Sequence, residues 1–200
     1  MSLKYKIYQS EYPYHIFNRT NNKEFIFDLN RDFSIFTSCL KYIQKKTDFR
    51  LHHFILMGNH YHIIGSTPCA NLNEIMRGFQ TLVSHLINEK TGRINHIFGN
   101  RYGATVVQSE IYLSYLIRYV YQNPVKAGIV QNAMLYPYSS AVFYLKNQLQ
   151  CYGLTPDPYL GKFDPMKRSF ELSRLCETYL SEGESNLIGK KLKKTIFNFE

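Results

Sequence analysis

Two histidines separated by one residue are the first feature of this 200-residue chain that could do chemistry. His60 and His62 fall in a predicted strand, where side chains two apart project from the same face. Two imidazoles on one face could hold a divalent cation between them. The pattern alone is weak evidence, because the neighbouring pair His52 and His53 shows that histidines also occur in strands without such a role.

A tyrosine and an asparagine form the second candidate group. Tyr119 and Asn123 are four residues apart near the end of a predicted helix, so they share one face of it. A nucleophile that attacks a phosphodiester must present an oxygen in line with phosphorus, beside a cation that neutralises the phosphate oxygens. Tyr119 would supply the oxygen and the histidines the cation. A packing role stays open for Tyr119, because other tyrosines crowd the same helix, namely Tyr112, Tyr115 and Tyr121.

The spacing of apolar residues predicts the elements that must position these side chains. Apolar residues at three- and four-residue steps predict helices over 28–47 and 71–91, the second closed by Gly92. A further helix over 110–123 follows Ser109 as its cap and ends before Pro124, which disfavours more helical turns. The predicted strands are 12–19, 49–57, 60–66 and 104–108, with a tight turn at 58–59.

The order of these elements predicts an α+β fold of the ferredoxin-like, split βαβ type. Such a fold has a four-stranded antiparallel sheet with two helices on one face, and the other face is available for a ligand. The tyrosine-bearing helix is an addition to this plan. Prolines interrupt the chain after residue 155, and one more helix is predicted over 166–181. We therefore expect a catalytic domain over 1–140 and an accessory, helical C-terminal extension over 141–200.

Composition favours a nucleic acid partner. The chain has 24 Lys and Arg against 15 Asp and Glu, a formal charge of +9, and 16% of its residues are Tyr or Phe. Positive charge attracts phosphates, and aromatic rings can stack on unpaired bases. No apolar run approaches the roughly 18–20 residues of a membrane span, and no signal peptide is recognisable, so we expect a cytoplasmic protein without a membrane partner.

Several motifs together resemble the single-tyrosine HUH transposases, within the IS200-like superfamily. They are Phe-Ile-Leu-Met-Gly-Asn-His-Tyr-His at 54–62 and Arg-Tyr-Val-Tyr-Gln-Asn-Pro-Val-Lys-Ala-Gly at 118–128. Two further stretches agree, Tyr-His-Ile-Phe-Asn-Arg at 14–19 and Tyr-Pro-Tyr-Ser-Ser at 136–140. The resemblance covers about residues 12–140 and is closer to the branch of REP-associated tyrosine transposases.

The resemblance implies an activity and a set of site residues. His60 and His62 would bind a divalent metal ion, Mg²⁺ or Mn²⁺, with Asn123 where the family places a third metal-binding side chain. Tyr119 would attack single-stranded DNA to give a 5′-phosphotyrosine and a free 3′-hydroxyl. The sequence leaves open whether that DNA is a hairpin or a repeat. The resemblance leaves open whether the active unit is a homodimer. The basic residues that we expect to contact DNA are Arg19, Arg101, Arg118 and Lys126.

Two other classes of protein compete with this interpretation. A non-catalytic or domesticated single-stranded nucleic-acid-binding protein could use the same fold, with structural histidines and base-stacking aromatic residues. A zinc hydrolase is less favoured, because no acidic residue stands at a recognisable spacing from the histidines. Near the end of the chain, a basic cluster is either a solvated tail or a phosphate contact; it consists of Lys190, Lys191, Lys193 and Lys194.

Overall fold

A single five-stranded sheet forms the centre of the molecule, and the computed structural model describes residues 9–10, 12–192, 194 and 196–197. The strand order is β2-β3-β1-β4-β5. The first four strands pair antiparallel in the order of a ferredoxin-like fold, which confirms the predicted fold class. The fifth strand, which pairs parallel to β4, was not predicted. The strands are β1 (Tyr14–Arg19), β2 (Arg50–Met57), β3 (His60–Ser66), β4 (Gly103–Val107) and β5 (Ile196–Phe197).

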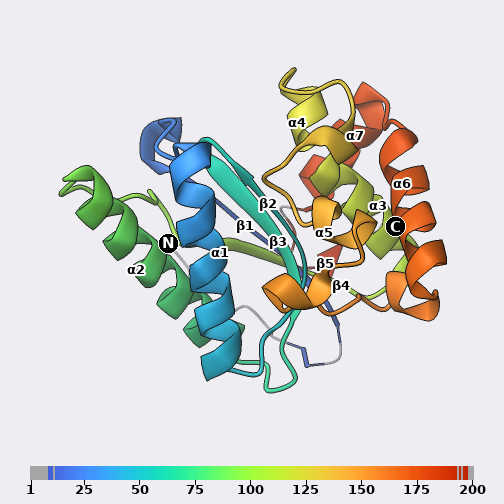
Figure 1. The fold of residues 1–200 in the computed structure, drawn as a ribbon, viewed down its shortest axis with the longest axis horizontal. Helices are drawn as coiled ribbons and strands as arrows, with labels where there is room; N and C mark the ends of the chain where they lie inside the picture. Colours follow the sequence, from blue (N-terminus) through green and yellow to red (C-terminus); the bar gives the residue numbers. More distant parts are fainter. Residues whose placement is uncertain (1–8, 11, 193, 195, 198–200) are drawn as a thin grey trace.

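Two long helices, α1 (Leu29–Lys46) and α2 (Leu72–Thr91), cover one face of the sheet (Figure 1). Both lie within the predicted ranges. Helix α2 ends where Gly92 adopts a left-handed conformation with φ 67°, and its N–H donates to the Asn88 carbonyl. A residue without a Cβ adopts this conformation without steric cost, so the helix ends at the predicted position.

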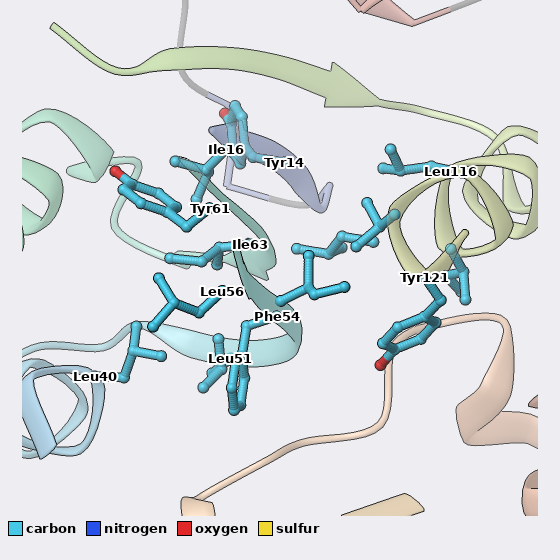
Figure 2. Packing of buried hydrophobic residues seen from close by; sticks show 14 of the residues in the cluster. Tyr14, Ile16, Leu40, Leu51, Phe54, Leu56, Tyr61, Ile63, Leu116 and Tyr121 are labelled. Carbon is cyan, nitrogen blue, oxygen red and sulfur yellow. The ribbon is translucent and has the colours of Figure 1, made fainter. Parts of the chain in front are cut away.

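Alternation along the strands divides their side chains between the two faces of the sheet. Phe54 and Tyr61 point toward α1 and α2, where the ring centroid of Phe36 lies 6.2 Å from that of Phe54 and 5.6 Å from that of Tyr61. Figure 2 shows Leu40 of α1 on one side of the strands, and Leu116 and Tyr121 of the tyrosine-bearing helix on the other. The sheet is therefore packed on both faces.

Helices of the second half of the chain cover the other face (Figure 1). This face is thus less open than the sequence suggested. The tyrosine-bearing helix α3 runs over Glu110–Tyr121, and the chain turns at Gln122 into a short helix, α4 (Asn123–Lys126), which contains Pro124 near its start. The other helices are α5 (Ala141–Leu145), α6 (Pro165–Glu177) and α7 (Glu182–Lys191), with short 3-10 helices at Asn21–Lys23, Ala133–Leu135, Leu149–Tyr152 and Leu160–Lys162.

The C-terminal segment differs most from the prediction. The helix expected over 166–181 ends at Glu177, and a separate helix, α7, follows it. Lys190 and Lys191 lie in the last turn of α7 rather than in an unstructured tail. Lys194 lies just beyond α7, and Lys193 lies outside the described residues. No helix in the described part of the chain combines the length and apolar character of a membrane span.

The motif at 136–140 binds the free edge of β2. The N–H of Leu56 donates to the Tyr138 carbonyl at 2.9 Å, and the N–H of Ser140 donates to the Phe54 carbonyl at 2.9 Å. The Tyr136 hydroxyl also donates to the Leu56 carbonyl. Pairing of this kind satisfies backbone groups that an edge strand would otherwise expose. This motif is therefore structural, and it joins α4 and α5 to the sheet.

A buried polar network anchors the end of α3. His53 donates from Nε2 to the Asp157 carboxylate at 2.7 Å, and its Nδ1 pairs with the Tyr121 hydroxyl at 2.7 Å. The Tyr121 hydroxyl also pairs with the Ser140 hydroxyl at 2.7 Å. The network links β2, α3 and the loop before α6, so it fixes the helix turn that carries Tyr119.

Candidate active site

The two histidines of the motif lie on β3 and face α3 rather than α1 and α2. In the pairing of β1 with β3, Arg19 is opposite His60 and Phe17 is opposite His62, so these four side chains share one face. The imidazole centroids of His60 and His62 are 5.3 Å apart, with their rings nearly perpendicular. The sequence expectation that both rings project from one side of a strand is confirmed by the register. Tyr61, between them, is fully buried on the opposite face.

Each of the two histidines has a hydrogen-bond partner at Nδ1. The Nδ1 of His60 lies 2.7 Å from the Asn59 side-chain oxygen, and the Asn59 amide nitrogen donates to the Lys23 carbonyl. The Nδ1 of His62 lies 2.8 Å from the Nε2 of His15, a buried residue on β1. Among the described residues, no partner occupies the Nε2 of His60 or His62. Each ring is therefore oriented through its Nδ1, and its Nε2 has no partner in the described part of the protein.

Burial keeps these imidazoles in the neutral form. Desolvation lowers the pKa of His60 to about 4, and the charge of Arg19 adds to this effect. Desolvation lowers the pKa of His62 well below its usual value, with further contributions from the neighbouring histidines and Arg19. The pKa of His15 is lowered by burial to about 3. A neutral imidazole is the form that binds a metal ion.

Tyr119 reaches the histidines from α3. Its ring meets that of His62 edge to face, with centroids 6.1 Å apart and an interplanar angle of 83°. Burial raises the pKa of Tyr119, while the positive charge of Arg19 lowers it. Arg19 therefore favours the phenolate form that a nucleophile needs.

The other tyrosines of α3 have different surroundings. Tyr121 is buried in the polar network behind the sheet, and the ring of Tyr112 packs against Phe197 of β5. The guanidinium of Arg118 lies over the ring of Tyr115, 5.3 Å from its centroid. Tyr119 is the tyrosine of α3 that lines the pocket of the histidines. The structure thus separates the candidate nucleophile from its packing neighbours, which the sequence could not do.

A pocket of about 480 Å³ contains the site. His60, His62 and Tyr119 line it together with two exposed arginines, Arg19 and Arg101. The cations stand at the rim, where they could contact phosphates that approach the tyrosine. The remaining lining residues are His15, Phe17, Asn18, Tyr61, Asn100, Gly103, Asn123, Gly189 and Leu192.

The two other basic residues expected to bind DNA do not line this pocket. Arg118 faces Tyr115, and its Nε is buried without a hydrogen-bond partner among the described residues. The Lys126 ammonium donates to the Ser185 hydroxyl of α7 at 2.9 Å. The structure therefore brings Arg19 and Arg101 to the histidines and places Arg118 and Lys126 elsewhere.

Asn123 lies in the same pocket, but its side chain folds back onto α3. Its amide nitrogen donates to the carbonyls of Tyr119 at 2.8 Å and Val120 at 3.2 Å. Its oxygen has no hydrogen-bond partner among the described residues, and only this atom of the side chain could bind a cation. Asn123 and Tyr119 also line an adjoining pocket of about 370 Å³, between α4 and the start of α7.

The donors of the pocket fit a weakly held divalent cation. In the described part of the chain, no group of three or more His, Cys, Asp or Glu side chains is placed to hold a metal ion. A structural zinc site needs four such ligands, so this arrangement is not one. Two neutral imidazoles and one amide oxygen would leave coordination positions for water or phosphate, as a catalytic ion requires.

Three neighbours of the site were not singled out from the sequence. His15 and Asn59 bond to the histidines, and Gly189 of α7 lies against Tyr119. A Cβ added at Gly189 would be 3.6 Å from the Tyr119 hydroxyl. For His15 a signal existed, because it alternates with Phe17 and Arg19 along one strand and therefore shares their face. Gly189 had no such signal, because the packing of α7 is a tertiary feature.

The site thus consists of a histidine pair on a ferredoxin-like sheet that faces a tyrosine on the helix after the last antiparallel strand. The sequence model of the family described as "Transposase IS200 like" matches residues 8–123, more than half of the chain. This chain belongs to that family. A solved structure described as a REP-associated tyrosine transposase bound to a REP hairpin is similar at a TM-score of 0.62 and 17% identity. The similarity covers 78% of this chain and 89% of the other. No curated protein matches the chain.

Proposed function

We propose that this transposase cuts and rejoins single-stranded DNA in a reaction that depends on a divalent metal ion, with Tyr119 as the nucleophile. The observation that carries the proposal is the edge-to-face contact of Tyr119 with His62, inside a pocket that also holds His60 and Arg19. The phenol offers a nucleophilic oxygen, the two neutral imidazoles can hold a metal ion, and the guanidinium of Arg19 can bind a phosphate.

The chemical step is a transesterification. The Tyr119 oxygen forms a bond to the scissile phosphorus, the bond from phosphorus to the 3′ oxygen breaks, and the DNA stays joined to the protein as a 5′-phosphotyrosine. The phenol releases its proton to water in the pocket, and the departing 3′ oxygen takes up a proton. Attack by the 3′-hydroxyl of another end reverses the step and rejoins DNA. The number of phosphoester bonds is unchanged, so no nucleotide cofactor is needed.

The residues of the pocket have separate roles in this proposal. Mg²⁺ or Mn²⁺, held by His60 and His62 with Asn123 beside them, would neutralise charge on the phosphate oxygens. Arg19 binds the scissile phosphate and favours the phenolate of Tyr119, since its charge already lowers the pKa of that group. Arg101 binds a neighbouring phosphate at the rim.

We extend the substrate to hairpin-forming or repeat DNA, because the similar solved transposase is described as bound to a REP hairpin. The net charge of +9 supports a nucleic acid ligand. In this proposal residues 141–200 are an accessory to the catalytic part, with Lys126, Arg118 and the lysines near the end of α7 as secondary phosphate contacts. Rejoining requires two DNA ends, and a homodimer that brings them together stays a prediction.

A strand-labelling experiment tests the function. The protein is incubated with Mn²⁺ and a single-stranded oligonucleotide that contains a hairpin, labelled at its 5′ or its 3′ end in separate reactions. We expect the 3′-labelled fragment to become bound to protein and the 5′-labelled fragment to be released with a free 3′-hydroxyl. Binding without cleavage, in the presence of either Mn²⁺ or Mg²⁺, would favour the non-catalytic binding protein instead.

A further inference from the structure

The hydrogen bonds around the histidine pair determine which ring nitrogen of His60 carries the proton and leave two arrangements for His62. For His60, both polar atoms of the Asn59 side chain have an assigned partner. The Asn59 amide nitrogen donates to the Lys23 carbonyl at 3.0 Å, so its side-chain oxygen must be the atom 2.7 Å from the Nδ1 of His60. An amide oxygen only accepts hydrogen bonds. His60 therefore carries its proton on Nδ1, and its Nε2 has a free lone pair.

For His62 the partner is another imidazole, and two arrangements are compatible with the 2.8 Å contact between its Nδ1 and the Nε2 of His15. If His15 donates, His62 carries its own proton on Nε2 and has no lone pair there. If His62 donates, its Nε2 is free to bind a cation. The hydrogen bond can thus exist in two tautomeric forms. Only the form in which His62 donates allows the Nε2 of His62 to bind a metal ion.

The surroundings of His15 show what balances the two tautomers. Its ring stacks on both Phe17 and His62, with centroids 5.1 Å and 5.0 Å away. Its Nδ1 is buried and has no hydrogen-bond partner in the part of the chain that the structure describes. When His62 donates, this nitrogen must carry an unpaired N–H, which costs free energy. Cation binding at the Nε2 of His62 would have to offset that cost.

We propose that Asn59 and His15 are positioning residues that set the tautomers of His60 and His62, so that both rings present Nε2 to one divalent cation. Asn59 holds His60 in one tautomer with or without the cation. His15 instead changes from donor to acceptor when His62 binds the cation. Partners of this kind behind metal-binding histidines orient the rings and raise metal affinity. The inference rests on the proposed metal-dependent function. The tautomer of His60 follows from its hydrogen bonds alone.

Nuclear magnetic resonance of the ring nitrogens tests the inference directly. In protein labelled with ¹⁵N-histidine, long-range proton–nitrogen correlations distinguish protonated from unprotonated ring nitrogens, and single His→Gln variants assign the signals. We expect His60 to be protonated on Nδ1 without metal. We expect His62 to be protonated on Nδ1 when Zn²⁺ is added as a diamagnetic probe. Protonation of His60 on Nε2 without metal, or of His62 on Nε2 with Zn²⁺, would overturn the proposal.

Metal affinity provides a second readout, measured as free Mn²⁺ by electron paramagnetic resonance. Asn59→Ala and His15→Phe should each weaken Mn²⁺ binding by about 10- to 100-fold, the usual effect of losing such a partner. Asn59→Asp and His15→Gln keep an acceptor and should lose less. His52→Phe is the matched control, because His52 is a buried histidine bonded to Thr155 and Ser66 outside the pocket.

The outcomes separate this inference from the proposed function. Unchanged Mn²⁺ affinity in folded Asn59→Ala and His15→Phe proteins, checked by thermal unfolding, would overturn the positioning roles. If one variant fails to fold, the tautomers in the unaltered protein still decide the question. Failure of the unaltered protein to bind Mn²⁺ would overturn the metal-dependent function itself, whatever the tautomer of His60.

Discussion

The rings of Tyr119 on α3 and His62 on β3 meet nearly at right angles, with centroids 6.1 Å apart. The two residues come from different elements, and the sheet and the buried network around Tyr121 together set their separation. The contact places the candidate nucleophile and the candidate metal ligands in one pocket, where each can be substituted separately.

Replacing both His60 and His62 with Ala should abolish cleavage while the protein stays folded. The two imidazoles would hold the cation that stabilises charge on the phosphate by several kcal/mol, so cleavage should fall by at least about 100-fold. Gel assays with labelled DNA measure the loss, and thermal unfolding checks the fold. Normal cleavage by the unaltered protein in excess chelator would show that the histidines have no role through a metal ion.

Arg19→Ala should impair both cleavage and DNA binding. Loss of one phosphate contact to a single strand should reduce the slope of log affinity against log salt concentration by about 0.7. Arg174→Ala is the matched control, because Arg174 is an exposed arginine of α6 that pairs with Glu171 outside the pocket. Filter binding at several salt concentrations gives the slopes. Equal effects of both substitutions would show that Arg19 contributes only general positive charge.

Gly189→Leu should obstruct the nucleophile. The position of a Cβ at Gly189 is 3.6 Å from the Tyr119 hydroxyl, so Ala would fit at ordinary contact distance whereas a longer side chain would enter the pocket. We expect cleavage to fall by about tenfold or more, which corresponds to roughly 1.4 kcal/mol in the barrier. Gly189→Ala and Gly183→Leu are the controls, the latter on the same helix. Full activity of the Leu variant would mean that α7 leaves the hydroxyl during catalysis.

Asp157→Asn should destabilise the fold without changing a residue that lines the pocket of the histidines. Burial alone would raise the pKa of Asp157, but its hydrogen bond and charge interaction with His53 lower it below 3.8. A carboxylate with a lowered pKa contributes stability above about pH 4, and the contribution is lost as the pH falls through the folded-state pKa. Breaking the buried pair should cost about 3 kcal/mol near neutral pH.

Urea unfolding of both proteins between pH 7 and pH 3 measures this effect. The unaltered protein should lose stability in the acid range more steeply than Asp157→Asn, because only its side chain at this position takes up a proton. Identical stability of the two proteins at neutral pH would show that the His53 network does not support the end of α3.

Local sequence pattern predicted most of the fold from β1 to α3. The strand at His60–Ser66 and the end of the helix before Gly92 were predicted to the residue, because alternation, helical periodicity and glycine caps are properties of the sequence near them. Alternation also explains why Tyr61, between the two histidines, is fully buried on the opposite face of the strand. The division at residue 140 stays a prediction.

Tertiary contacts decided what the sequence could not. The β5 strand is two residues long, and it pairs with β4 far away in the chain, so no local signal marks it. Helix α7 did carry a signal, since Ser181 and Glu184 form a capping box that starts it. In the site, the positions of Tyr119 and the histidines followed from spacing and resemblance. The hydrogen bond between His15 and His62 depends on the register of β1 and β3, which the sequence left open.

Mapping the covalent adduct tests the central claim most directly. The unaltered protein and the variants Tyr119→Phe and Tyr115→Phe are incubated with Mn²⁺ and hairpin-containing single-stranded DNA, and the adduct is located by mass spectrometry of peptides. We predict a 5′-phosphotyrosine at Tyr119 in the unaltered and Tyr115→Phe proteins. We predict neither adduct nor cleavage with Tyr119→Phe, which loses one hydroxyl and keeps the ring. Cleavage by Tyr119→Phe, with the adduct on another residue or with none, would contradict the assignment of Tyr119 as the nucleophile.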